Sequence, residues 1–203
     1  MTDISHFYDE DNNIVRYDQL EVQEQLDAKE FIKEDDIVIE LGARWGGVSV
    51  IINSILKNKK NHVAVEPDKV VWDALEKNRD NHNCEFIIIK GAISNKPLKI
   101  DKSDKRWNGL ATFTKGTSIH KSDVKSYDLP DLKYNVLVSD CEGFLETFYD
   151  ENKDIFKGLR LILLEKDRPE ECDYPYLYRE FKKLGFTETR DSGDHKVFHN
   201  HHI

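Results

Sequence analysis

The segment IVIELGARWGG, residues 37–47, decides the expected fold of this chain. Its first five residues form a short, nearly continuous apolar run, which is typical of a strand buried on both faces of a sheet. Gly42 and Gly46 then interrupt the run, and the apolar stretch 48–56 has helical potential. A strand, a glycine turn and a helix in this order are how each unit of a parallel α/β sheet begins.

The same alternation continues along the chain. Further buried strands are expected at 62–65, 86–89, 135–139 and 159–164, with helices starting at Pro67 (to about residue 78) and at 144–156 and 174–184. A helix is expected at 17–33 and irregular structure in the first 15 residues, and the chain should close with strands at 185–189 and 196–199 around a turn at 191–194. Five strand–helix units and a final hairpin predict a seven-stranded, mainly parallel α/β sheet with helices on both faces.

Length and charge limit the classes of function. The chain has 203 residues, which suits a single domain over 1–203, with an N-terminal segment at 1–34 and an insertion at 96–134. Its net charge of −9 argues against a long nucleic acid as partner, and no apolar run reaches the ~20 residues of a membrane span. The N-terminus lacks signal-peptide features and the three cysteines are scattered, so we expect a cytoplasmic protein without a membrane partner. The oligomeric state stays open.

Two acids and two glycines point to a nucleotide-type cofactor. Ligands of such sheets bind beyond the carboxyl ends of the strands, where Glu40 precedes the glycine turn and Glu66 ends the second strand. A carboxylate at Glu66 can take both hydroxyls of a ribose, and one at Glu40 suits a cationic amino group. The turn is neither a GxGxxG fingerprint nor a phosphate-binding loop, so the set favours S-adenosylmethionine over a nicotinamide. A plain tight turn and an ordinary surface carboxylate are the alternatives.

The segment after the fourth strand, SDCEGF at 139–144, carries a family resemblance. It resembles the Asp-x-Glu-Gly segment of the FkbM-type methyltransferases, and 40–43 and 91–94 resemble the acid-x-Gly-Ala turn and the short Ala-containing segment of that family. The resemblance covers about 36–164, although Arg44-Trp45 and Ser139 depart from it. It implies a Rossmann-like class I methyltransferase fold of strand order 3-2-1-4-5-7-6, with methyl transfer to a hydroxyl, often on a sugar.

The expected site residues follow from the motifs together with this resemblance. The expected cofactor-binding residues are Glu40, Gly42, Ala43, Arg44, Trp45, Gly46, Glu66, Pro67, Gly91, Ala92 and Asp140. Asp140 is the expected base, because a base that accepts a hydroxyl proton speeds transfer by about 10²–10⁴-fold. Glu142 is the second carboxylate and His120 an alternative base. Hydrogen bonding of Asp140 to the cofactor amino group and capping of a helix by Glu142 are the alternatives.

The remaining candidates concern the acceptor and a metal ion. The insertion 96–134 holds Trp107, Phe113 and His120 and is the expected substrate wall, with a two-strand flap as the alternative. Asp140 and Glu142, with Glu165 or Asp167, could hold Mg²⁺, but an exposed charged loop at 165–168 is favoured. We assign no site to the histidines at 195, 199, 201 and 202.

The resulting expectation is an S-adenosylmethionine-dependent O-methyltransferase that transfers a methyl group to a hydroxyl of a sugar or glycan precursor. The alternatives are a methyltransferase acting on an RNA cap or a small molecule, an NAD-binding oxidoreductase, and a non-catalytic binding module with the same fold.

Overall fold

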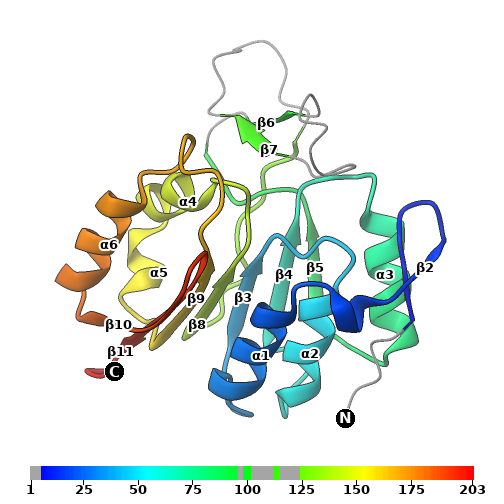
Figure 1. Ribbon diagram of the computed structural model, residues 1–203, viewed down its shortest axis with the longest axis horizontal. Coiled ribbons are helices and arrows are strands. Elements are labelled where there is room, and N and C mark those ends of the chain that lie inside the picture. The colour runs from blue at the N-terminus through cyan, green and yellow to red at the C-terminus, as the bar shows by residue number, and fades with distance from the viewer. Residues whose placement is uncertain (1–5, 96–97, 102–111, 115–123) are drawn as a thin grey trace.

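A seven-stranded sheet forms the middle layer of the computed structural model, which describes residues 6–95, 98–101, 112–114 and 124–203 (Figure 1). Its strands are β3 (Val38–Leu41), β4 (His62–Glu66), β5 (Ile87–Lys90), β8 (Val136–Ser139), β9 (Leu161–Glu165), β10 (Phe186–Ser192) and β11 (His195–Asn200). They run in the spatial order β10-β11-β9-β8-β3-β4-β5. The five from β9 to β5 are parallel, whereas β11 and β10 are antiparallel to their neighbours. Counted along the chain, this is the expected order 3-2-1-4-5-7-6 with a closing hairpin, so the predicted fold is confirmed.

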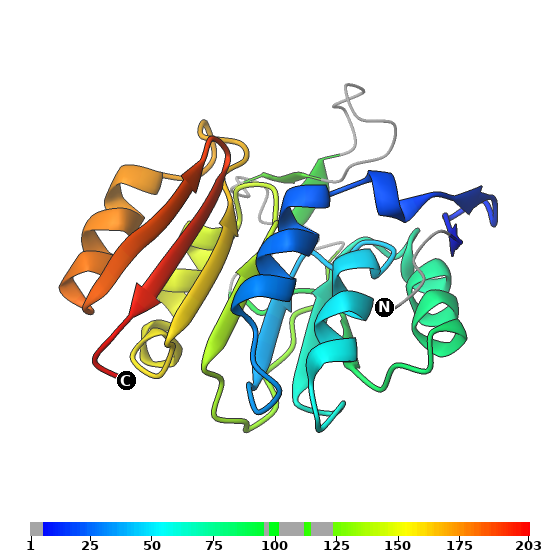
Figure 2. The same cartoon turned by 60° about the horizontal axis from the view of Figure 1, so that its bottom comes forward.

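Helices cover both faces of the sheet, as Figure 2 shows. On one face lie α1 (Val22–Phe31), α2 (Gly47–Ile55) and α3 (Trp72–Asn81), and on the other α4 (Leu145–Glu151), α5 (Lys153–Phe156) and α6 (Tyr174–Lys183). Alternate residues of each buried strand feed the two cores: in β3, Val38 packs with the α1–α3 layer, and Ile39 and Leu41 pack with the α4–α6 layer. No helix in the described part of the chain is long and apolar enough to cross a membrane.

The N-terminal segment differs from its expected irregular structure. The short strands β1 (Phe7–Tyr8) and β2 (Ile14–Val15) pair with each other, and a 3-10 turn η1 (Tyr17–Gln19) precedes α1. The Phe7 ring is fully buried and lies 5.1 Å from the ring of Tyr17. Asn78 of α3 bonds the backbone N–H and carbonyl of Tyr8, which anchors this segment to the α1–α3 layer.

Three element boundaries also differ from expectation. Pro67 does not start a helix, because 68–71 first form a turn and α3 begins at Trp72. The expected helix at 144–156 is divided at Asn152, whose backbone (φ −131°, ψ 36°) is not helical. The closing hairpin turns at Gly193 (φ +79°) and the next residue, so its strands are longer than predicted.

Part of the insertion 96–134 forms a second small sheet. The strands β6 (Lys99–Asp101) and β7 (Thr112–Thr114) pair antiparallel, above the carboxyl ends of the parallel strands in Figure 1. The end of the insertion returns to the main sheet, where Ser126 bridges to Ala92 in parallel fashion. The insertion therefore returns along the end of β5, on the side of the sheet where ligands of this fold class bind.

Candidate active site

A pocket opens at the carboxyl ends of the central strands, where the fold predicts a ligand. It encloses about 640 Å³, part of which is open to solvent. Its lining residues come from the ends of β3, β4, β5 and β8 and the loops that follow them: Leu41, Gly42, Arg44, Val65, Glu66, Pro67, Asp68, Val71, Gly91, Ala92, Asp140, Cys141, Glu142 and Phe144. The structure thus brings together eight of the residues expected to line a cofactor or catalytic site, from four separate segments.

Gly42 and Gly91 are required by the backbone around the pocket. Gly42 has φ +90°, and a Cβ atom there would lie 1.6 Å from the carbonyl oxygen of Asp140. A Cβ atom at Gly91 would lie 2.2 Å from the carbonyl oxygen of Lys125. The glycines therefore let neighbouring backbone segments approach each other closely around the pocket.

Glu66 is the best-defined polar group of the pocket wall. Its two carboxylate oxygens each accept one backbone N–H, from Arg44 (2.7 Å) and from Asp68 (2.7 Å). Burial raises the pKa of Glu66 to about 7, against the lowering effect of these two bonds. Each carboxylate oxygen has a second lone pair. The group is therefore held in one orientation and can still accept two hydroxyl hydrogens from a ligand in the pocket.

Asp140 lies across the pocket from this wall, at the end of β8. Its backbone N–H donates to the Leu41 carbonyl (3.0 Å), which fixes the residue beside the end of β3. Burial, and then the charges of Glu165 and Asp167, raise the pKa of the Asp140 carboxyl well above its usual range. A carboxylate with a raised pKa holds a proton more strongly than an ordinary Asp, which is a property that favours a general base.

Glu142 and Asp167 form a bonded group next to Asp140. The Asp167 carboxylate accepts the backbone N–H groups of Glu142 (2.5 Å) and Gly143 (2.8 Å) and the hydroxyl of Tyr174 (2.8 Å). The Glu142 carboxylate pairs with Nε of Arg168 (2.9 Å). The segment 165–168 is thus half-buried and bonded to the site, and the favoured expectation of an exposed charged loop is wrong.

Glu40 points towards α2. Its carboxylate accepts the hydroxyl of Ser49 (2.5 Å) and contacts Nε2 of His62 (3.0 Å), and all three residues are buried. Glu40 shares the face of Val38, which packs in the core with α2, and it is absent from the residues that line the pocket. Its expected contact with the cofactor stays a prediction.

Three more expected residues belong to the turn after β3 but do not line the pocket. Ala43 is buried in the core under α2. The Trp45 indole N–H donates to Glu10 (2.8 Å), and the Arg44 guanidinium lies over the Trp45 ring, 4.2 Å from its centre. Gly46 starts α2 with φ +86°. None of Ala43, Trp45 and Gly46 lines the pocket, so they shape the turn from outside it.

Several site residues were missed from the sequence. Asp68 and Phe144 line the pocket, and the acids Glu21 and Glu24, at the start of α1, lie close enough to Asp140 for their charges to interact. Asp68 lies two residues after Glu66 and Phe144 directly follows the Asp-x-Glu-Gly segment, so both could have been found by proximity to a motif. Glu21 and Glu24 carry no sequence signal, because only the packing of α1 brings them to the site.

The expected residues of the insertion lie largely outside the described part of the chain. This applies to Trp107 and His120. Phe113 belongs to β7, of which only the backbone is described. The roles of His120 as an alternative base and of 96–134 as a substrate wall stay predictions.

Comparison with known proteins gives a result at the level of structure. No family model matches the sequence, so the resemblance to FkbM-type enzymes finds no support there, and no curated protein matches it. A structure from Pyrococcus horikoshii, provisionally described as an RNA methyltransferase, aligns over 87% of this chain and 80% of its own, with a TM-score of 0.51 and 14% identity.

Two further structures cover most of this chain at lower TM-scores. One is precorrin-6y C5,15-methyltransferase from Geobacter metallireducens, with a TM-score of 0.46 and 14% identity over 87% of this chain and 82% of its own. The other is ribosomal protein L11 methylase from Lactobacillus delbrueckii, with a TM-score of 0.48 and 11% identity over 87% of this chain and 75% of its own. The fold assignment rests on the observed strand order and on the Pyrococcus structure. This chain has the Rossmann-like fold of the class I methyltransferases.

Proposed function

We propose that this protein is an S-adenosylmethionine-dependent methyltransferase that acts on a hydroxyl group. The observation that carries the proposal is the placement of two acids in one pocket. Glu66 is fixed by two backbone N–H groups on one wall, and Asp140 lies on another. In this proposal Glu66 binds the nucleoside of the cofactor and Asp140 accepts a proton.

The pocket suits the three chemical parts of the cofactor. The free lone pairs of Glu66 would accept the two ribose hydroxyls. Apolar side chains of the lining, Val65 and Val71 among them, offer a surface for a flat base. The acid Asp140 suits a cationic end better than a pyrophosphate, which supports this cofactor over a nicotinamide dinucleotide. S-adenosylmethionine, when bound, supplies an electrophilic methyl group on a sulfonium centre.

The role of the chain's own residues is to position the acceptor and to take its proton. The Asp140 carboxylate would accept the proton of the acceptor hydroxyl while the new oxygen–carbon bond forms. Burial and the nearby carboxylates hold its pKa above that of an ordinary Asp, so it is a stronger base than a surface carboxylate. Positioning the hydroxyl against the methyl group is the other large contribution that an enzyme makes to such a displacement.

We propose a saccharide or glycan precursor as the acceptor. The hydroxyl preference follows the resemblance of 140–143 to enzymes that methylate sugars. The acidic character of the site also disfavours RNA. The carboxyl groups of Glu21 and Glu165 lie close enough to Asp140 to raise its pKa, and Asp140 in turn raises the pKa of Glu24. A phosphate backbone is repelled by such a group, since its binding depends on basic side chains.

The test is transfer of a labelled methyl group to a panel of sugars, nucleotide sugars, capped RNA and cell extract. We expect label in a saccharide, with a rate that falls about 10²–10⁴-fold in Asp140→Asn, because the base is lost. Asp154→Asn is the matched control, since Asp154 is exposed on α5 and pairs only with Lys157 among the described residues. Label only in RNA would contradict the acceptor class, and full activity of Asp140→Asn would contradict its role as the base.

A further inference from the structure

Three possible metal ligands from distant parts of the sequence meet beside the pocket. Glu24 lies on α1, Glu165 ends β9 and His195 begins β11. One ligand atom of each lies within 4.8 Å of the corresponding atoms of the other two. Two oxygen donors and one imidazole nitrogen therefore converge from three separate elements.

The sheet and α1 hold these three residues in place. Glu165 and His195 are directly opposite each other in the antiparallel pairing of β9 and β11, so their side chains share a face of the sheet. The face is the one covered by α1, because Leu163 and Val197, two residues along each strand, belong to the core on the α1 side. The ligands thus do not depend on a loose loop for their positions.

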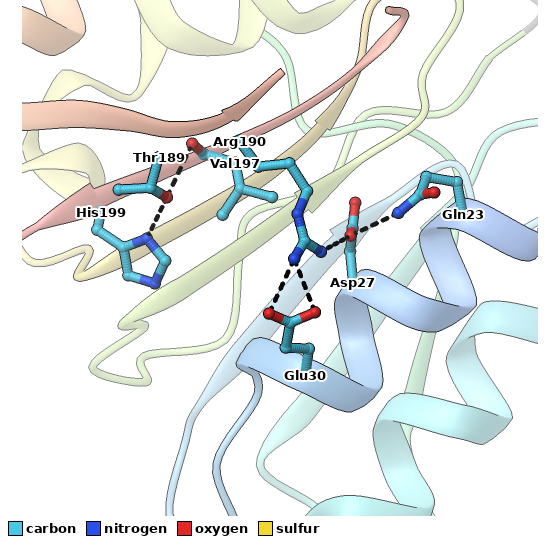
Figure 3. A network of polar contacts seen from close by, with 7 residues as sticks. All are labelled: Gln23, Asp27, Glu30, Thr189, Arg190, Val197 and His199. Carbon is cyan, nitrogen blue, oxygen red and sulfur yellow. Dashed lines mark hydrogen bonds and ion pairs between the residues drawn. The ribbon is translucent and has the colours of Figure 1, made fainter. Parts of the chain in front are cut away.

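A polar network fastens α1 to the hairpin next to the three ligands (Figure 3). Arg190 of β10 donates to Asp27 (2.7 Å) and to both oxygens of Glu30 (2.8 Å each), and Gln23 donates to Asp27 (2.8 Å). Asp27 lies three residues after Glu24 on α1, about one helical turn further along the same face. The network therefore sets the distance between the helix that carries Glu24 and the hairpin that carries His195.

One oxygen of this group has no partner among the described residues. The Oε1 atom of Glu24 is buried and takes part in no hydrogen bond with them. A ligand atom of Glu165 lies within 4.8 Å of one of Glu24, so two carboxyl groups meet there. A cation between them would give the buried oxygen a partner and would offset the repulsion between two negative charges.

A second group with similar spacing provides a contrast. One ligand atom each of Asp140, Glu142 and Asp167 also lie within 4.8 Å of one another. The Asp167 oxygens there accept two backbone N–H groups and a hydroxyl, and Glu142 pairs with Arg168. Asp167 and Glu142 thus already have partners within the chain, whereas the Oε1 atom of Glu24 has none among the described residues.

We propose that Glu24, Glu165 and His195 bind a divalent cation at the acceptor end of the pocket. Two carboxylates and one imidazole suit an ion that takes both oxygen and nitrogen ligands, such as Mn²⁺, better than Mg²⁺, which prefers oxygen ligands only. The three ligand atoms lie within 4.8 Å of one another, a spacing compatible with one ion bound between them. If the proposed function holds, the remaining positions on the ion face Asp140 and can orient acceptor hydroxyls.

The test uses Mn²⁺ alone, added to the full metal-free chain without cofactor. We expect one bound Mn²⁺ per chain by electron paramagnetic resonance and calorimetry, and a rise in melting temperature, since the ion binds only the folded state. Glu24→Gln and His195→Gln should each weaken binding by about ten-fold or more, because loss of even an indirect ligand contact costs 10–100-fold. Without metal, Glu24→Gln should melt close to the natural chain, because the amide matches the carboxyl in size and no bound ion is lost.

Control variants distinguish this site from the second group and from adventitious binding of Mn²⁺ to surface acids. Glu85→Gln and His201→Gln remove the same groups from exposed positions and should bind Mn²⁺ normally. Loss of binding in Asp167→Asn but not in Glu24→Gln would overturn the proposal in favour of the second group. Binding that all variants retain, or no binding at all, would also overturn it. S-adenosylhomocysteine binding is measured separately on the same samples, so failure of the proposed function is distinguished from failure of the metal site.

Discussion

Replacement of Glu66 by Gln tests the role of the pocket wall most sharply. A Gln side chain has one oxygen, so it can accept only one of the two N–H groups, from Arg44 and Asp68, that Glu66 accepts at 2.7 Å. It also loses an acceptor for a ribose hydroxyl. Each lost bond to a charged group costs about 1–3 kcal/mol, which weakens S-adenosylhomocysteine binding about 5–150-fold at pH 8.

The pH dependence of binding supplies a second, independent magnitude. Burial raises the pKa of Glu66 to about 7, so about a tenth of this carboxyl is ionised at pH 6 and about nine tenths at pH 8. If ribose hydroxyls donate to the ionised form, affinity should fall about ten-fold from pH 8 to pH 6. Calorimetry at both pH values measures this ratio, which should move towards one in Glu66→Gln.

The matched control for this experiment is Glu85→Gln, which changes an exposed Glu just before the amino end of β5, whereas the pocket lies at the carboxyl ends of the strands. It should bind as the natural chain does at both pH values. Equal affinity of Glu66→Gln and the natural chain at pH 8 would refute the assignment of Glu66 as a cofactor ligand.

Three further predictions concern stability and the metal site. Gly42→Ala should fold poorly, because its Cβ atom would lie 1.6 Å from a carbonyl oxygen. Gly193→Ala has no atom within 4 Å of its Cβ position, so its positive φ should lower the free energy of unfolding by only about 1–2 kcal/mol. Urea unfolding compares the stability of the two variants. Burial raises the pKa values of Glu21 and Glu66 from 4.5 to about 7, so the folded state keeps protons that the unfolded state releases. The free energy of unfolding should therefore fall between pH 5 and pH 8, by at most about 3 kcal/mol per group. A rise over this range would contradict these shifts. Arg190→Gln should weaken Mn²⁺ binding several-fold by loosening α1, and unchanged binding would show that the network of Figure 3 does not position the ligands.

The fold could be predicted from the sequence because its strands are buried on both faces. Continuous apolar runs such as 37–41 fit a central parallel strand, and the alternation with helices restricts the topology. Boundaries were less predictable where local chemistry competes. Pro67 fits the first turn of a helix, but the Asp68 N–H is bonded to Glu66, and the chain makes a turn there before α3 begins.

The site could be predicted only in part, for two physical reasons. A strand presents alternate residues to opposite faces, and the sequence of a strand buried on both sides does not say which face holds Glu40. Contacts between distant elements carry no local pattern either. The meeting of Glu24, Glu165 and His195 depends on the hairpin register and on the packing of α1, so the sequence alone assigns no site to the histidines of this region.

A crystal structure of the complex with S-adenosylhomocysteine tests the central claim most directly. The account predicts the nucleoside in the pocket at the carboxyl ends of β3, β4 and β8, with its ribose hydroxyls on the Glu66 carboxylate and its sulfur directed towards Asp140. A ligand bound elsewhere on the molecule, or a pocket that takes up NADH and not S-adenosylhomocysteine under the same conditions, would contradict it.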